Sequence, residues 1–298
     1  MSLSSWNETA TKQAILDFLA RASDENNPDY IPPAERIAAF DNDGTLWVEQ
    51  PMPAQTGFLL GKLAEQVRAN PALAAKEPYQ SIVNRDPAFL HALSQQSSDA
   101  GATFLKAVGS AWDGTSPEAY EAEAQAFLAT LKHPRFGCLW IELIYQPMLE
   151  LFDLLRANSW RVFVCSGGGR DFMRIFSEQA WGILREDVIG SALQYVYENG
   201  RLVRSKIMLG NIALGPGKVE HIYDRTGRMA LFAGGNADVD LEMLQSARFR
   251  LVVVHDDAER EYAITAAAEK LLAASQQGGW VMVSMKNDWK TVYKDAQY

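Results

Sequence analysis

Short apolar segments that each end in a cluster of polar residues and glycine constrain the fold of this chain most strongly. Continuous apolar runs bounded by turn residues are typical of strands buried on both faces. Helical patterns separate these segments, and strands that alternate with helices predict a parallel, doubly wound sheet. Ligands bind such sheets at the carboxyl ends of the strands, which is where the polar clusters fall. The segments end at Phe40, Cys165, Ala233 and Val254.

A long helical stretch interrupts this alternation after the first strand. From about Ala54 to Leu131 the apolar residues recur at helical spacing, and no segment there favours a strand. We therefore expect an α/β fold with a Rossmann-like core at residues 1–53 and 146–298. A helical cap domain is expected at residues 54–145, inserted after the first motif.

Local signals predict several individual elements. Ser116 is a predicted N-cap with Pro117 at the first helical position. Alternating apolar residues on both sides of Asn199-Gly200 predict a β-hairpin. Helices are also expected at residues 11–23 and 146–158.

Composition excludes some classes of function. The chain has 298 residues and a net charge of -9, which argues against a nucleic-acid partner because phosphate-backbone binding needs a basic face. A small anionic substrate remains compatible with this charge, since local charge can oppose the net field. No apolar run approaches the length of a membrane span, so no membrane partner is expected.

The two cysteines, Cys138 and Cys165, give no disulfide framework and no metal-ligand spacing. Cys165 lies in an apolar run and is expected to be a buried small side chain. The start of the chain shows no signal peptide, but Met1 to Leu3 could replace a removed segment. A periplasmic location is expected in that case and a cytoplasmic one otherwise. The oligomeric state stays open.

The first polar cluster is Asp41, Asp43, Gly44 and Thr45, in the sequence "FDNDGT". Two carboxylates on one face of a strand end repel each other unless a cation or a proton lies between them. An Asp-Gly surface turn is the simpler alternative. A calcium loop fits poorly, because that motif needs glycine at its sixth position and Gly44 comes fourth.

The later clusters each have an ordinary structural explanation. The glycine-rich stretch after Ser166 could cradle an anion or serve close packing. Lys218 is not part of a P-loop and could be a solvated surface lysine. Asn236, Asp238 and Asp240 could start a helix. His255, with two aspartates after it, favours a capped helix entry over a substrate contact.

The order of the clusters is more specific than any one of them. Asp-x-Asp-Gly-Thr, then strand-Ser-Gly, then a lysine, then Gly-Asn-x-x-x-Asp resembles the haloacid dehalogenase (HAD) superfamily of phosphohydrolases. The stretch Ser166-Gly167-Gly168 is similar to the branch of phosphoserine and phosphorylcholine phosphatases. The matching motifs run from Asp41 to Asp240. The helical insert is similar to the cap of this family.

The resemblance implies Mg²⁺-dependent hydrolysis of a small phosphomonoester through an aspartyl-phosphate. It makes Asp41 the nucleophile and Asp43 the general acid and base. Because an ordinary aspartate is a poor acid at neutral pH, we expect either a raised pKa of Asp43 or a preference of the enzyme for mildly acidic conditions. It implies that Ser166 and Lys218 hold and neutralise the phosphoryl group, with Gly167 beside them. The full set of implied residues is Asp41, Asp43, Ser166 and Lys218 for catalysis; Gly167, Gly168, Thr45 and Glu49 for the substrate; and Asp41, Asp43, Asn236 and Asp240 for Mg²⁺.

One residue departs from the family pattern. Asn236 stands where many members carry an acidic residue, so the cation would lose one formal charge among its ligands. Asp240 matches the second acidic position, and Asp238 is a further candidate. Whether Asn236 or Asp238 completes the metal site is left open.

The substrate is less constrained than the chemistry. Glu49 could pair with a cationic leaving group, and tryptophans such as Trp47, Trp112 and Trp140 could bind a quaternary ammonium, although core packing is the favoured explanation for them. A phosphotransferase, a phosphomutase or a 2-haloacid dehalogenase on the same fold are the alternative functions. A dehalogenase needs no acid two residues after its nucleophile, so Asp43 argues against it. A non-enzymatic metal-binding protein is the remaining alternative.

Overall fold

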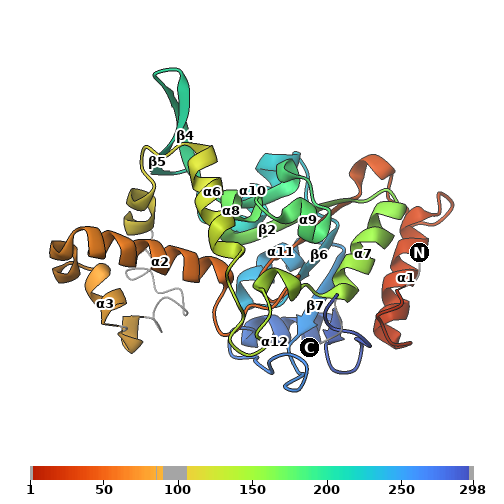
Figure 1. The fold of residues 1–298 in the computed structure, drawn as a ribbon. Helices are drawn as coiled ribbons and strands as arrows, with labels where there is room; N and C mark the ends of the chain where they lie inside the picture. The colour runs from red at the N-terminus through yellow and green to blue at the C-terminus, as the bar shows by residue number, and fades with distance from the viewer. Residues whose placement is uncertain (1–2, 85, 90–105, 295–298) are drawn as a thin grey trace. The chain divides into compact units, whose positions relative to one another are not determined.

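The structure is a computed structural model that describes residues 3–84, 86–89 and 106–294 (Figure 1). One sheet contains the strands β1 Ile37–Phe40, β2 Arg161–Gly169, β3 Val188–Ser191, β6 Phe232–Gly235, β7 Phe249–Val254 and β8 Val281–Ser284. Their order is β3-β2-β1-β6-β7-β8, and every neighbouring pair is parallel. The parallel, doubly wound sheet predicted from the sequence is confirmed.

Helices cover both faces of this sheet (Figure 1). They are α1 Ala10–Ser23, α7 Gln146–Ala157, α8 Arg170–Met173, α9 Ser177–Trp181, α10 Pro216–Thr226, α11 Leu241–Gln245 and α12 Glu269–Gly278. On one face, Ala39 lies in a buried cluster with residues of α10, α11 and α12. On the other face, the ring of Phe40 lies 4.8 Å from that of Phe152 in α7, and Phe232 lies 6.0 Å from Phe18 in α1. Burial on both faces explains why the strands read as continuous apolar runs.

The chain changes direction in the sheet between β1 and β6. Strands β2 and β3 extend the sheet on one side of this pair, and β7 and β8 extend it on the other. The carboxyl ends of β1 and β6 therefore form the topological switch point, where ligands bind in open α/β sheets. Asp41 follows β1 and Asn236 follows β6.

The chain divides into two compact units. The first holds the parallel sheet and comprises residues 1–51, 131–191 and 212–298, and the second comprises residues 52–130 and 192–211. The sequence predicts one insert at 54–145, whereas the second unit takes in a later segment and leaves 131–145 to the first.

The second unit contains α2 Ala54–Ala69, α3 Tyr79–Val83, α6 Pro117–Leu128 and the hairpin β4 Leu193–Glu198 with β5 Arg201–Met208. The hairpin belongs with these helices because the Arg204 guanidinium lies 3.9 Å from the ring centroid of Tyr120, and the Arg204 carbonyl accepts a hydrogen bond from the Gly114 N–H. The predicted helical pattern is present in the described residues, and its part at 90–105 lies outside them.

Several local predictions are confirmed. The Ser116 hydroxyl accepts a hydrogen bond from the Ala119 N–H, as an N-cap does. Asn199 and Gly200 have φ values of 50° and 79°, as a type I′ hairpin turn requires. One prediction differs, because β2 continues to Gly169 with a register shift after Ser166, where the sequence indicates a turn directly after the strand.

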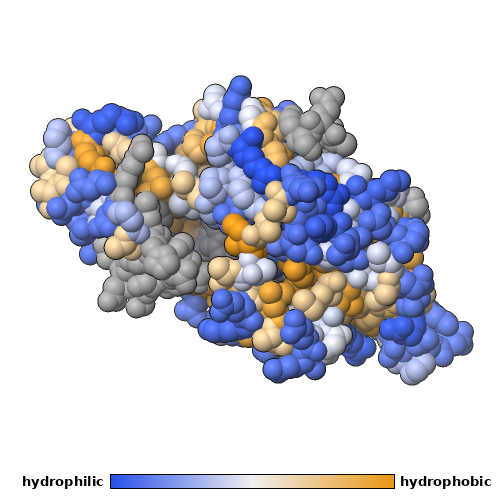
Figure 2. Space-filling model, turned by 90° about the horizontal axis from the view of Figure 1, so that it is seen from below, coloured by the Kyte–Doolittle hydropathy of each residue, from blue (hydrophilic) through white to orange (hydrophobic). Residues whose placement is uncertain are grey.

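The face shown in Figure 2 is mostly hydrophilic, with smaller hydrophobic areas between the polar ones. Apolar side chains scattered over a surface in this way are normal for a globular protein. In the part of the chain that the structure describes, no helix combines the length and apolar character that crossing a membrane requires.

Close packing between β1 and β6 predicts a large effect of one added methyl group. A Cβ at Gly234 would lie 2.4 Å from Phe40 Cδ1, whereas a Cβ at Gly61 in α2 would meet nothing within 4 Å. We expect Gly234→Ala to lower the free energy of unfolding by about 1–3 kcal/mol through overpacking. The control Gly61→Ala should be neutral or stabilising by up to about 1 kcal/mol, as alanine favours helices. Urea denaturation of both variants measures this, and equal effects would contradict the packing argument.

Candidate active site

The end of β1 delivers Asp41 to the switch point with a fixed backbone. Phe40 pairs with Gly234 of β6, and the Asp41 N–H donates to the Gly234 carbonyl at 2.9 Å. The ladder therefore continues to Asp41 itself, and its side chain starts from a rigid position.

A buried lysine lies between two carboxylates at this position. Lys218 Nζ is 2.5 Å from Asp41 Oδ1 and 2.5 Å from Asp240 Oδ1, and its side chain is fully buried. Burial would lower the pKa of Lys218, but the charges of Asp240 and Asp41 raise it above its ordinary value. The alternative of a solvated surface lysine is therefore wrong, because the first turn of α10 points Lys218 into the protein.

Asp240 holds both the lysine and the loop after β6. Its second oxygen, Oδ2, accepts hydrogen bonds from the backbone N–H groups of Asn236 at 2.9 Å and Ala237 at 3.0 Å. Both carboxylate oxygens are therefore occupied by protein donors. Asp240 therefore positions Lys218, and its direct contact with a cation stays a prediction.

The two aspartates of the first cluster have raised pKa values. Burial raises the pKa of Asp41 to about 7, and the Asp240 carboxylate adds to this while Lys218 opposes it. Burial likewise raises the pKa of Asp43 to about 7, as expected from the sequence for a general acid at neutral pH. Among the described residues, no hydrogen bond reaches Asp41 Oδ2, so this oxygen is available to an incoming group.

Trp47 orients the side chain of Asp43. Its indole N–H donates to Asp43 Oδ1 at 2.8 Å, and its ring stacks on Phe176 at a centroid distance of 4.7 Å. Trp47 is only 1% exposed, and Trp112 and Trp140 are buried as well. The packing explanation for these tryptophans is confirmed, and the substrate contact is not needed to account for them.

Gly44, Thr45 and Asn236 form a tight junction between the loops after β1 and β6. Gly44 has φ +73°, and a Cβ there would lie 2.2 Å from Asn236 Nδ2 and 2.9 Å from Glu49 Cδ. The Thr45 hydroxyl donates to Asn236 Oδ1 at 2.8 Å and is fully buried. Only glycine fits at position 44. Thr45 therefore contacts Asn236 and Glu49 lies beside Gly44, and contact of Thr45 and Glu49 with a substrate stays a prediction.

Oxygen atoms at this junction fit a hard divalent cation. Asp41 offers a carboxylate oxygen that no donor among the described residues contacts. The amide oxygen of Asn236 accepts one hydrogen bond from Thr45 and keeps one lone pair for a cation. The peptide carbonyl of Asp43, two residues after Asp41, is the third candidate ligand. Hard oxygen ligands of this kind suit Mg²⁺. Within the described ranges, no group of three or more His, Cys, Asp or Glu side chains could hold a metal ion. The candidate set differs from such a group because it includes the amide of Asn236 and a backbone carbonyl.

Ser166 and its glycines reach the same edge of the sheet. Phe40 of β1 pairs with Val164 of β2, so Ser166 follows two residues later at the carboxyl end. The Gly168 N–H donates to Ser166 Oγ at 3.1 Å, and the Gly167 carbonyl accepts from Ser191 Oγ at 2.8 Å. Contact of Ser166, Gly167 and Gly168 with a substrate stays a prediction. Cys165 is fully buried and unpaired with another cysteine, as predicted.

A buried pair formed by His255 and Glu261 lies beside the first cluster, and the sequence does not predict it. His255 Nε2 lies 2.7 Å from the Gly44 carbonyl oxygen, and its Nδ1 lies 3.0 Å from Glu261 Oε2. The predicted helix entry after Val254 is wrong, because an irregular segment follows and α12 begins only at Glu269. A histidine at a strand end was the available signal, and nothing local marks Glu261. The Asp238 carboxylate accepts a hydrogen bond from the Leu271 N–H at 2.9 Å, and whether Asn236 or Asp238 completes a metal site stays a prediction.

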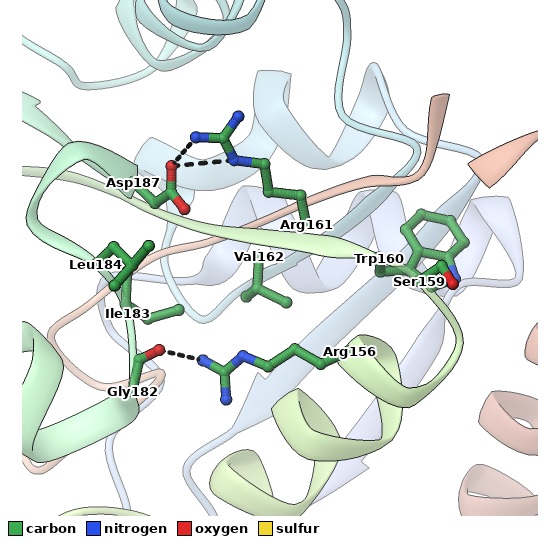
Figure 3. A pocket seen from close by; sticks show the side chains of 9 residues that line it. All are labelled: Arg156, Ser159, Trp160, Arg161, Val162, Gly182, Ile183, Leu184 and Asp187. Carbon is green, nitrogen blue, oxygen red and sulfur yellow. Dashed lines mark hydrogen bonds and ion pairs between the residues drawn. The ribbon is translucent and has the colours of Figure 1, made fainter. Parts of the chain in front are cut away.

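A separate pocket of about 390 Å³ opens at the opposite end of β2 (Figure 3). Figure 3 shows its arginines turned toward protein acceptors: Arg161 pairs with Asp187, and Arg156 donates to the Gly182 carbonyl. The pocket lies at the amino end of a parallel strand, whereas the polar clusters lie at the carboxyl ends. It is therefore not the site that the sequence motifs define.

The chain belongs to the haloacid dehalogenase-like hydrolase family, whose pattern matches residues 38–245. This range contains Asp41, Lys218 and Asp240, which the structure brings into contact.

Solved structures share the fold at low sequence identity. A conserved functionally unknown protein from Anaerococcus prevotii is 15% identical, with a TM-score of 0.62 over 98% of each chain. A protein with unknown function from Bordetella pertussis is 16% identical, with a TM-score of 0.55 over 84% of this chain and 98% of its own. A probable phosphoserine phosphatase from Vibrio cholerae is 16% identical, with a TM-score of 0.42 over 73% and 55%. No curated protein matches the sequence. At these identities the likeness to the Anaerococcus prevotii and Bordetella pertussis proteins shows the fold alone.

The raised pKa values predict how stability depends on pH in the metal-free protein. Asp41 and Asp43 move from an ordinary pKa of 3.8 to about 7, so between these values the folded state binds more protons than the unfolded state. Their contribution is therefore fully present below about pH 4 and is lost as pH rises through 7, by roughly 4 kcal/mol per group.

Urea denaturation in EDTA at a series of pH values measures this, with Asp43→Asn as the comparison. The difference in unfolding free energy between wild type and Asp43→Asn should shrink or reverse as pH rises toward 8. A difference that stays constant would show that the pKa of Asp43 is not raised.

Proposed function

We propose that this chain hydrolyses a small phosphomonoester through a phosphoryl intermediate on Asp41. The observation that carries the proposal is the Lys218 ammonium, buried between Asp41 and Asp240 at 2.5 Å from each. A fixed cation beside one carboxylate oxygen leaves the other oxygen free to attack and neutralises charge that develops there. Membership of a hydrolase family supports the hydrolytic part of the proposal.

In the first step, Asp41 Oδ2 attacks phosphorus while the leaving oxygen departs on the opposite side. Lys218 keeps Asp41 Oδ1 in place, so the attacking oxygen is oriented before the substrate arrives. The Ser166 hydroxyl and the Gly167 N–H are proposed to hold the phosphoryl oxygens. Attack requires the carboxylate form of Asp41, which a neighbouring cation favours.

Asp43 is proposed to protonate the leaving oxygen and then to take a proton from the attacking water. Its pKa of about 7 places both protonation states within reach near neutral pH. The Trp47 N–H donates to Asp43 Oδ1 at 2.8 Å and the Asn42 amide donates to Oδ2 at the longer distance of 3.3 Å, so Oδ2 is the proposed position for the proton.

Mg²⁺ is the proposed cofactor. Asp41, the carbonyl of Asp43 and Asn236 would hold it, and when bound it offsets the charge between a carboxylate and a dianionic phosphate. Thr45 fixes the amide of Asn236, and Asp240 is already committed to Lys218 and two backbone groups. We therefore propose that Asp240 acts through Lys218 and that the cation has fewer charged ligands than usual.

The proposed substrate is a small phosphorylated metabolite. The family resemblance implies a cap, and a cap favours small molecules over phosphoproteins because closure excludes large chains. Phosphoryl transfer to an organic acceptor is the second candidate, since it uses the same first step. Asp43, half-buried two residues after the proposed nucleophile and held by Trp47, favours both over dehalogenation.

Asp41→Asn should abolish phosphate release, because an amide cannot form the intermediate. We expect a panel of small phosphomonoesters to reveal turnover by wild type that requires Mg²⁺ and falls at least about 10³-fold in Asp41→Asn. Added alcohols that yield new phosphoesters would indicate transfer, and halide release from 2-haloacids would indicate dehalogenation. Retention of substantial activity by a folded Asp41→Asn variant would overturn the mechanism.

Trp47→Phe tests the orientation of Asp43. The variant keeps the aromatic packing and removes the N–H donor, so kcat should fall roughly tenfold as the general acid loses its alignment. Burial raises the pKa of Asp43 and the Trp47 hydrogen bond opposes this, so its loss should shift the basic limb of the pH–rate profile upward.

Trp140→Phe is the matched control, since the Trp140 N–H donates to the Val48 carbonyl at 3.0 Å instead of to a carboxylate. The Trp140→Phe variant should be less stable than wild type but should keep the same pH–rate profile. Equal kinetic effects in both variants would show that Trp47 only packs.

A further inference from the structure

We propose that His255 is a buried imidazolium, fixed by Glu261, that positions the catalytic loop by holding the Gly44 carbonyl. The kinetic part of this inference rests on the proposed function, whereas the charge on His255 and its effect on the cation site are independent of it.

The hydrogen-bond partners of His255 require a proton on both ring nitrogens. Nε2 faces the Gly44 carbonyl oxygen at 2.7 Å, and a carbonyl oxygen can only accept. Nδ1 faces Glu261 Oε2 at 3.0 Å. Glu261 accepts from the Tyr145 hydroxyl at 3.1 Å through Oε1 and from the Tyr262 N–H at 2.5 Å through Oε2, so both of its oxygens act as acceptors. A neutral imidazole has only one N–H, so it would leave one of these contacts between two acceptors.

The surroundings of the ring also favour its charged form. His255 is 4% exposed and Glu261 is fully buried, so water cannot replace these contacts. Glu49 and Glu261 are the carboxylates that act on the ring, and Tyr145 packs against it. Burial would lower the pKa of His255, but the hydrogen bond and charge of Glu261, followed by the charge of Glu49, raise it above the ordinary value.

The adjacent acidic residues are engaged elsewhere. Asp256 accepts from the Ser284 hydroxyl and the Lys286 N–H, and Asp257 pairs with Arg260. Neither competes with Glu261 for the histidine.

A second buried histidine shows the opposite arrangement. His133 Nε2 lies 2.7 Å from the Gln50 carbonyl oxygen and must donate to it. Its Nδ1 accepts from the Arg135 N–H at 3.2 Å and the Phe136 N–H at 3.3 Å, so this nitrogen carries no proton. His133 is therefore a neutral Nε2–H tautomer, and burial lowers its pKa. The two histidines are similarly buried and differ in what faces Nδ1.

A hydrogen bond to the Gly44 carbonyl restrains the loop after β1 at a position where the backbone is already tightly packed. Gly44 has φ +73° and fills a space bounded by Asn236, so its peptide has little freedom. The preceding residue is Asp43, and the following residue is Thr45, whose hydroxyl fixes Asn236. A hydrogen bond from a charged donor to the Gly44 carbonyl therefore restrains both sides of the proposed cation site.

Imidazole ¹H–¹⁵N correlation spectra of the ¹⁵N-labelled, metal-free wild type test the charge directly. The chain has four histidines, so the loss of one pattern in His255→Gln and of another in His133→Gln assigns both. At about pH 7.5, one unit above the ordinary histidine pKa of about 6.5, His255 should carry protons on both nitrogens and His133 on Nε2 alone. A neutral His255 at this pH would overturn the proposal whether or not the enzyme is a phosphatase.

Binding of Mn²⁺, followed by electron paramagnetic resonance, tests the positioning. His255→Gln should weaken Mn²⁺ binding about tenfold or more and lower kcat more than it raises KM, whereas the control His133→Gln should leave both unchanged. Glu261→Gln should convert His255 to a neutral ring at about pH 7.5 and weaken Mn²⁺ binding similarly. Unchanged Mn²⁺ affinity in a folded His255→Gln variant would refute the positioning. If no phosphomonoester is turned over, the spectra still test the charge on His255 and the Mn²⁺ affinities still test its effect on the cation site.

Discussion

The ammonium of Lys218, enclosed between Asp41 and Asp240, is the interaction on which the rest of the site depends. It joins three parts of the fold: the end of β1, the first turn of α10 and the loop after β6. Removing a single partner of such a buried cluster leaves an uncompensated charge, which is far more costly than the loss of a surface ion pair. The geometry of the proposed nucleophile Asp41 and the stability of the sheet edge are therefore maintained by the same contacts.

Charge balance explains the character of the surrounding residues. Asp41, Asp43, Glu49, Asp240 and Glu261 lie around this edge of the sheet, with Lys218 and the proposed imidazolium of His255 as the protein cations. The excess of carboxyl groups favours a bound cation or bound protons. An anionic substrate would be repelled from a site of this kind without a divalent ion. With the neutral Asn236 among its proposed ligands, such an ion would depend more on the orientation of Asp41 and of the Asp43 peptide.

The sequence could predict the sheet and the first-cluster residues because both follow from local patterns. An apolar run fixes a buried strand, and the residue after it must lie at the strand's carboxyl end. The contacts of Thr45 with Asn236, of Lys218 with Asp41 and of His255 with Gly44 could not be predicted in this way, since they join residues far apart in the chain. The order of the motifs predicts a role for Lys218 at the site. Its burial follows from the direction in which α10 places the side chain, which the sequence does not show. The hairpin was predicted locally, and only tertiary contacts assign it to the second unit.

The central claim is that a phosphoryl group passes through Asp41, and trapping that group tests it most directly. Wild type mixed with ³²P-labelled p-nitrophenyl phosphate and Mg²⁺, then quenched in acid within the first turnover, should carry label on the peptide that contains Asp41. Acyl phosphates survive brief acid and are cleaved by hydroxylamine, so the label should show this behaviour and be absent from Asp41→Asn. Phosphate release by the wild type with no label on the protein, or with label on another residue, would contradict the account.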